Sequence, residues 1–123
     1  MGLHRIIVID DCRLTQHMTK DILEKEGYEV GTADNGIEAC KTITVGKKPS
    51  LLLIDVTMPF IEGDTLVKVL KRNSETKTIP ILFYSSKPDM DLQLLVEATG
   101  ADGFLTKAAT PEELILAVNN ILS

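Results

Sequence analysis

The chain has 123 residues, of which 44% are hydrophobic and 25% are charged, as in an ordinary soluble globular protein of one domain. Its formal net charge of −5 argues against a general nucleic-acid-binding protein, because such proteins present basic patches. No apolar stretch approaches the ~18 residues that a membrane span needs, and neither Cys12 nor Cys40 has the spacing of a zinc ligand. We expect a soluble, cytoplasmic protein with one domain over residues 1–123 and with reduced, packed thiols. We expect no direct contact with nucleic acid or membranes.

The first predicted element is a strand that leads into a helix. Residues 6–9 are all β-branched, which favours a strand over a helix, and Asp10 and Asp11 follow directly. From residue 13 to about residue 26 the hydrophobic period becomes that of a helix, which Gly27 ends. The apolar face expected for this amphipathic helix consists of Leu14, Met18 and Ile22.

A weaker strand precedes the most hydrophobic one. Residues 28–33 alternate only weakly and contain Gly31, which indicates a strand at the edge of a sheet. Turn and cap residues at 34–36 lead into a short helix over residues 37–45. Residues 51–54 are four apolar residues in a row, which predicts a strand buried on both faces of a parallel sheet. Asp55 stands where that strand emerges.

The alternation continues with a helix, a strand and another helix. A helix is expected over residues 64–72, followed by an apolar strand over residues 80–85 that ends in Ser85. Pro88 suits the first turn of the next helix, which Gly100 stops. The face expected to pack from the helix over residues 64–72 consists of Leu66, Val69 and Leu70.

A short strand and a well-marked helix complete the pattern. Residues 103–107 form the last strand, which ends in Lys107. Thr110 is suited to cap the final helix, with Pro111 at its first position and Glu113 at its third, so a capping box is expected. The buried stripe expected for this helix consists of Leu114, Val118 and Ile121.

Five strands that alternate with five helices predict an α/β fold, a three-layer (βα)5 sandwich around a parallel five-stranded sheet. The strands with unbroken apolar runs should be central, and the weaker second and fifth strands should be edges. The flavodoxin-like strand order 2-1-3-4-5 satisfies this assignment with right-handed crossovers. Because ligands bind at the carboxyl ends of such strands, the polar residues expected to meet there are Asp10, Asp11, Asp55, Ser85 and Lys107.

Three carboxylates in one crevice repel one another, by roughly 4 kcal/mol per pair at ~4 Å and an effective dielectric constant of ~20. Either the pKa of one carboxyl rises or a cation lies among them, and an oxygen-only ligand set favours Mg²⁺. Lys107 is a compact cation suited to pair with the same anion. The alternative is that the acids only cap helices and that Lys107 is a surface charge.

The chain resembles the receiver domain of two-component response regulators, the CheY-like phosphoacceptor domain, essentially over its whole length. The motif that carries this resemblance consists of Asp10, Asp11, Asp55, Met58, Pro59, Gly63, Ser85 and Lys107. The resemblance implies a phosphorylation-activated switch of a phosphorelay rather than an enzyme. It also implies a histidine kinase or phosphotransfer protein as donor, and a downstream protein or fused output domain as reader. A dimer that forms on phosphorylation is left open.

The resemblance further implies a role for each matching residue. Asp55 corresponds to the aspartate that accepts the phosphoryl group. Ser85 and Lys107 correspond to the residues that contact this group, and Ser85 and Phe104 correspond to the switch pair. The Mg²⁺ ligands of the family correspond to Asp10, Asp11, Asp55 and the backbone carbonyl of Thr57.

One feature departs from the family pattern. Ala108 follows Lys107 where the family commonly has a proline after a cis bond, so we expect a trans bond here.

Two rival functions remain. One rival is a Mg²⁺-dependent phosphohydrolase, although Asp10-Asp11-Cys12-Arg13 lacks the D-x-D motif of such enzymes. The other rival is a receiver-like binding module without phosphorylation. Both a stand-alone protein and the receiver of a longer regulator fit the sequence.

Overall fold

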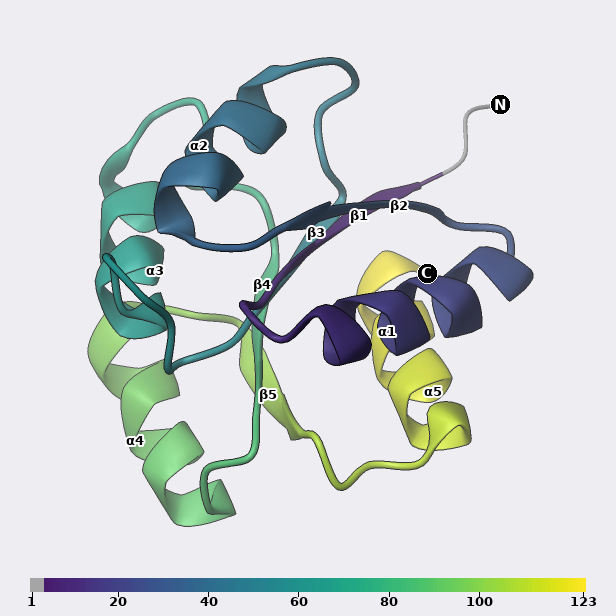
Figure 1. The fold of residues 1–123 in the computed structure, drawn as a ribbon. Helices are drawn as coiled ribbons and strands as arrows, with labels where there is room; N and C mark the ends of the chain where they lie inside the picture. The colour runs from purple at the N-terminus through teal and green to yellow at the C-terminus, as the bar shows by residue number, and fades with distance from the viewer. Residues whose placement is uncertain (1–3) are drawn as a thin grey trace.

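Five parallel strands and five helices alternate along residues 4–123, the part of the chain that the computed structural model describes (Figure 1). The elements are β1 (Arg5–Ile9), α1 (Arg13–Lys25), β2 (Glu29–Ala33), α2 (Gly36–Thr44), β3 (Leu51–Ile54), α3 (Gly63–Arg72), β4 (Ile81–Ser85), α4 (Asp89–Thr99), β5 (Gly103–Thr106) and α5 (Pro111–Leu122). The predicted α/β class is confirmed. The domain predicted over residues 1–123 includes residues 1–3, which lie outside the described residues.

The sheet has the predicted strand order, β2-β1-β3-β4-β5, and every neighbouring pair is parallel. The central strands β1, β3 and β4 are buried apart from Arg5, whereas the edge strands β2 and β5 are partly exposed. Ile9 at the end of β1 lies opposite Ile54 at the end of β3. The residues that follow, Asp10 and Asp55, therefore leave the sheet side by side.

Two hydrophobic cores lie on opposite faces of the sheet. α1 and α5 cover one face, and α2, α3 and α4 cover the other (Figure 1). Successive residues of β1 point to alternate faces, so Ile7 packs into the α2–α4 core and Ile6 into the α1–α5 core. Because both faces are covered, the central strands need apolar residues at every position, which explains their unbroken hydrophobic runs.

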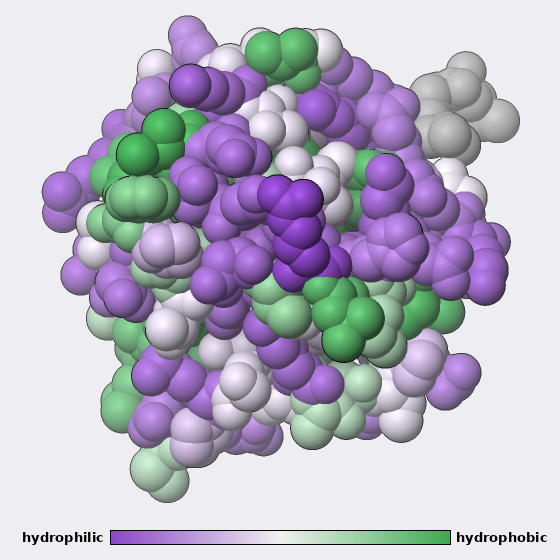
Figure 2. Space-filling view, in the orientation of Figure 1, coloured by the Kyte–Doolittle hydropathy of each residue, from purple (hydrophilic) through white to green (hydrophobic). Residues whose placement is uncertain are grey.

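The apolar face predicted for α1 is wrong at Leu14 and Met18, whereas Ile22 packs, partly buried, against the α1–α5 core. Leu14 is 68% exposed and Met18 is 54% exposed, and Figure 2 shows hydrophobic surface over the first turns of this helix. The buried face consists of Gln16, Thr19 and Leu23. The helix has this rotation because Gln16 donates hydrogen bonds to carbonyl groups at the ends of β1 and β2, which need partners when buried.

The expectations about Val69 and about the two thiols are wrong, and the expectation about the capping box is confirmed. On α3, Val69 is exposed and Val67 packs in its place. Cys12 and Cys40 are both exposed rather than packed. The capping box of α5 is confirmed, since Thr110 and Glu113 exchange side-chain-to-backbone hydrogen bonds of 3.1 and 2.8 Å. None of the helices within residues 4–123 has the length and apolar character that crossing a bilayer requires.

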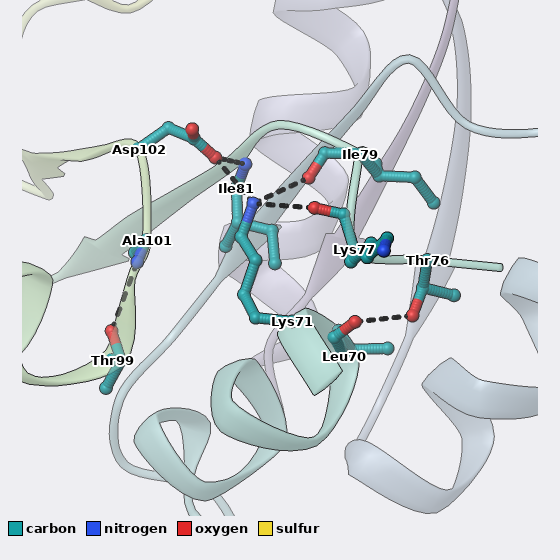
Figure 3. Close-up of polar contacts among 9 residues, drawn as sticks. All are labelled: Leu70, Lys71, Thr76, Lys77, Ile79, Ile81, Thr99, Ala101 and Asp102. Atoms are coloured by element: carbon teal, nitrogen blue, oxygen red, sulfur yellow. Dashed lines mark hydrogen bonds and ion pairs between the residues drawn. The ribbon is translucent and has the colours of Figure 1, made fainter. Parts of the chain in front are cut away.

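A polar network ties α3 to the beginnings of β4 and β5 (Figure 3). Lys71 Nζ donates to Asp102 Oδ2 at 3.0 Å and to the backbone carbonyls of Ile79 at 3.2 Å and Lys77 at 3.4 Å. The same Asp102 oxygen accepts the N–H of Ile81, the first residue of β4, at 2.8 Å. The network thus stabilises the amino-terminal edge of the sheet, opposite to the carboxyl ends of the strands.

Replacing Lys71 by methionine keeps most of the side-chain length but removes these donors. We expect the free energy of unfolding to fall by about 1–2 kcal/mol, because the partly buried Ile79 carbonyl loses its donor and the exposed Lys77 and Asp102 acceptors lose weaker contacts. Urea denaturation measures the change. Lys68→Met, on the exposed side of the same helix, is the matched control and should change stability by less than about 0.5 kcal/mol. Equal effects of the two substitutions would contradict the role given to the network.

Candidate functional site

Three carboxylates converge at the carboxyl ends of β1 and β3, as the sequence predicted. The sheet hydrogen bonding continues past both strands, since the Asp10 N–H donates to Ala33 O and the Asp55 N–H donates to Ile9 O, each at 3.0 Å. Asp10 is 1% exposed and Asp55 is 7% exposed, whereas Asp11 is exposed. One carboxylate oxygen from each of the three residues lies within 4.8 Å of the other two.

Lys107 joins this cluster from the end of β5. Its Nζ lies 2.7 Å from Asp10 Oδ2 and 3.3 Å from Asp55 Oδ2. Its backbone N–H donates to Ser85 O at 2.9 Å, which holds the loop after β5 against the end of β4. The lysine therefore lies between two buried carboxylates rather than on the surface, and the surface-charge alternative does not fit this geometry.

Ser85 is buried at the end of β4, next to the cluster. Its Oγ accepts the backbone N–H of Lys87 at 3.3 Å, and its hydroxyl lies close enough to the Asp55 carboxyl to lower the pKa of that group. Ser85 thus connects Asp55 to the loop that leads into α4.

The pKa values of the cluster show the competition between burial and charge. Burial raises the pKa of the Asp55 carboxyl, and the charge of Asp10 raises it further, while Lys107 and Ser85 partly oppose the rise. Burial alone would lower the pKa of Lys107, but the Asp10 and Asp55 carboxylates outweigh burial and raise it. Three carboxylates facing one ammonium group leave an excess of negative charge, which a further cation would neutralise.

The donor set fits a hard divalent cation. It consists of carboxylate oxygens, and Mg²⁺ commonly takes one or two carboxylates while keeping several waters. Asp10 Oδ2 is buried, and among the described residues its partner is the Lys107 ammonium at 2.7 Å, an ion pair rather than a hydrogen bond to a neutral group. Asp11 is exposed, so the same cluster is open to water on one side.

The loop between β3 and α3 passes unusually close to the backbone of Asp55. A Cβ atom at Gly63 would lie 2.0 Å from the Asp55 carbonyl oxygen, and the Gly63 N–H donates to Val56 O at 2.7 Å. Thr57 lies in this loop, and its side chain is exposed. Phe60, also in the loop, is 81% exposed and has a φ of +69°.

Phe104 lies on β5, opposite Phe83 of β4, and is partly buried against the α2–α4 core. It is on the strand that leads to Lys107. The bond between Lys107 and Ala108 is trans, as expected.

Sequence reasoning missed Gln16, and it named Gly63 in the motif without its close approach to the Asp55 backbone, which depends on the path of the loop. Gln16 was overlooked because it lies between the apolar residues of α1, yet it is buried beside Asp10. The spacing of apolar residues places Gln16 on the polar side of the helix, so it gives no signal for the burial of this residue.

Comparison with known proteins finds relatives over nearly the whole chain. The profile of the response regulator receiver domain matches residues 6–119. The phosphate regulon transcriptional regulatory protein PhoB of Pseudomonas aeruginosa is 33% identical over 95% of this chain and 51% of its own length. Protein PilH of the same organism is 29% identical over 97% of this chain and 98% of its own length. The chain thus spans about half of the first relative and nearly all of the second.

Solved structures show the same fold. The chemotaxis protein CheY4 of Vibrio cholerae has a TM-score of 0.90 with 28% identity, and covers 98% of this chain and 99% of its own. A CheY-like response regulator receiver domain protein from Methanospirillum hungatei has a TM-score of 0.88 with 26% identity, over 98% of this chain and 94% of its own.

Proposed function

Because the chain belongs to the response regulator receiver domain family of two-component systems, we propose that it is a phosphorylation-activated switch whose acceptor is Asp55. The donor is a phosphohistidine on a histidine kinase or phosphotransfer protein. One observation carries the proposal: the Asp55 carboxylate lies at the end of β3 within 4.8 Å of Asp10 and Asp11 and 3.3 Å from Lys107.

The proposed reaction is the attack of an Asp55 carboxylate oxygen on phosphorus. An oxygen–phosphorus bond forms, the phosphorus–nitrogen bond breaks, and its electron pair returns to the donor imidazole. Such a transfer needs alignment and charge neutralisation more than covalent assistance. Lys107 supplies positive charge to the phosphoryl oxygens, and the Ser85 hydroxyl supplies a hydrogen bond.

The residues proposed to hold Mg²⁺ are Asp10, Asp11, Asp55 and the backbone carbonyl of Thr57. When bound, the ion supplies positive charge that neutralises the phosphoryl oxygens. The oxygen-only donor set, and the burial of Asp10 Oδ2 with the Lys107 ammonium as its ion-pair partner, support this assignment. The exposure of Asp11 leaves room for the waters that Mg²⁺ retains.

The proposed output is a rearrangement between Asp55 and α4. Phosphorylation makes Asp55 more negative and attracts the Ser85 hydroxyl, which loosens its contact with the Lys87 N–H. Phe104 then turns inward towards the space that Ser85 leaves. The face formed by α4, β5 and α5 changes, and a downstream protein or a fused output domain reads it.

We further propose that residues 1–123 form a single receiver domain that acts in the cytoplasm. The reaction modifies the domain itself. We therefore propose a switch and not an enzyme that converts another molecule and releases it. Ser85 and Lys107 serve this self-modification.

The test is incubation of the purified chain with a small acyl-phosphate donor, with Mg²⁺ or with a chelator, followed by intact-mass measurement. We expect Mg²⁺-dependent addition of one phosphoryl group, and loss of this label to background in Asp55→Asn. Asp64→Asn, on α3 and outside the carboxylate cluster, is the matched control and should label like the wild type.

The other possible outcomes contradict the proposal, each in a different way. Absence of any label, in a folded chain with Mg²⁺, indicates a binding module. Repeated turnover of a small phosphate ester indicates a phosphohydrolase. Full labelling of Asp55→Asn means that another residue is the acceptor.

A further inference from the structure

Gln16 is a buried amide that the proposed reaction does not use. It lies on the inner face of α1 and is 7% exposed. Its Nε2 is in hydrogen-bond contact with the carbonyl of Asp10, with Ala33 O at 3.3 Å and with Asp34 Oδ1 at 2.7 Å. All three partners are acceptors, which is the environment of an amide nitrogen and not of an amide oxygen.

These acceptors lie where β1 and β2 end. Ala33 O, the last carbonyl of β2, also accepts the N–H of Asp10 at 3.0 Å. Gln16 therefore reaches from α1 to the point at which both strands leave the sheet. It supplies a donor to the Asp10 carbonyl and a second donor to the Ala33 carbonyl, which already accepts the Asp10 N–H.

Asp10 is held from three directions at this point. Gln16 binds its backbone carbonyl, the Cys12 N–H donates to its Oδ1 at 2.9 Å, and Lys107 faces its Oδ2 at 2.7 Å. The Cys12 and Lys107 contacts act on the carboxylate itself. The Gln16 contact acts on the main chain, and so it fixes the direction in which the carboxylate leaves the backbone.

The far side of the Gln16 amide is anchored by Asp34. Its carboxylate accepts from Gln16 and from Arg13 NH2 at 2.9 Å. The hydrogen bond from Gln16, followed by the charge of Arg13, lowers the pKa of the Asp34 carboxyl despite some burial. Asp34 is thus ionised at neutral pH, and a charged acceptor holds the amide more firmly than a neutral one.

We propose that Gln16 is a positioning residue for the carboxylate cluster, which raises its affinity for Mg²⁺ by fixing the backbone of Asp10. Gln16 contacts no carboxylate of the cluster. The inference rests on the magnesium site proposed above. Groups that orient metal ligands typically contribute about 10–100-fold to metal affinity.

The test is a Mg²⁺ titration of the unphosphorylated chain, followed by amide chemical shifts in NMR spectra. Gln16→Met has a similar size but no donor, and we expect about tenfold weaker Mg²⁺ binding or more. We also expect faster hydrogen exchange at the Asp10 amide. Gln16→Asn keeps the amide on a shorter chain and should lie between Gln16→Met and the wild type, and it replaces Gln16→Met if that variant does not fold.

Thr19→Val is the matched control. Thr19 is also buried on the inner face of α1, and its hydroxyl lowers the pKa of Tyr84 rather than contacting the Asp10 backbone. This variant removes a buried hydroxyl group, so it should be destabilised while its Mg²⁺ affinity changes less than twofold. Urea denaturation of all variants separates stability from affinity.

Three outcomes decide the inference. Weakened Mg²⁺ binding in the Gln16 variants alone supports it. Unchanged affinity in Gln16→Met, or an equal loss in Thr19→Val, overturns it and leaves the acceptor role of Asp55 intact. A wild-type chain that binds no Mg²⁺ overturns the metal site itself, and the inference with it.

Discussion

Replacing Gly63 by alanine is expected to lower the free energy of unfolding by more than about 4 kcal/mol, a size reached only by severe structural conflicts. The added Cβ atom would lie 2.0 Å from the carbonyl oxygen of Asp55 and 2.8 Å from the Cα of Val56. Both are backbone atoms, so no side-chain rotation relieves the clash. The Gly63 N–H is also bonded to Val56 O at 2.7 Å, which holds the two segments together.

Urea denaturation and the yield of folded protein measure this effect. Gly31→Ala is the matched control, because a Cβ atom there meets its nearest neighbour at 3.9 Å, an ordinary contact. The control should stay within about 1 kcal/mol of the wild type. If Gly63→Ala were as stable as Gly31→Ala, the close approach of the two backbones would be refuted.

Replacing Lys107 by methionine is expected to cost about 3–5 kcal/mol in the absence of divalent ions, because it removes one partner of a buried ion pair. Asp10 and Asp55 would then face each other without the ammonium group that lies 2.7 and 3.3 Å from them. Millimolar Mg²⁺ should restore much of this loss, since a divalent cation replaces the missing charge.

The same variant should respond to pH in a defined direction. Burial raises the pKa of Asp55, so the cost of its charge is absent at acid pH and grows as the pH rises through that pKa. Lys107 offsets this cost at neutral pH, and its own raised pKa keeps it protonated until the pH exceeds the ordinary lysine range. The destabilisation by Lys107→Met should therefore shrink as the pH is lowered.

Lys71→Met is the control for Lys107→Met. The two lysine side chains are similarly exposed, 18% and 21%, and each pairs with a carboxylate, but Lys71 lies at the opposite edge of the sheet. The decrease in the free energy of unfolding caused by Lys71→Met should not depend on Mg²⁺. Denaturation curves with and without Mg²⁺ give the comparison, and an equal Mg²⁺ response of both variants would argue against a cation site beside Lys107.

The sheet and the convergence of the carboxylates were predictable because simple rules govern them. A strand covered on both faces must be apolar at every position, so β1, β3 and β4 stand out as hydrophobic runs. Parallel strands place their carboxyl ends on one edge, which brings together residues as distant in sequence as Asp10 and Lys107. Neither inference needs the positions of individual side chains.

The rotation of α1 was not predictable from hydrophobic spacing. The apolar residues Leu14 and Met18 recur at helical intervals, yet the helix turns them outward and buries Gln16 and Thr19. The hydrogen-bond requirements of the strand ends outweigh the burial of two side chains, because unpaired buried carbonyls are costly. Spacing of apolar residues carries no information about such requirements.

Phe60 lowers the stability of the domain. Its backbone adopts a left-handed conformation, which costs a non-glycine residue roughly 1–2 kcal/mol, and its ring is 81% exposed, so it recovers little hydrophobic stabilisation. Glycine at this position would relieve the strain and lose almost no buried surface. The domain is therefore below its attainable stability at this loop, and folding alone does not account for an aromatic ring so close in sequence to Asp55.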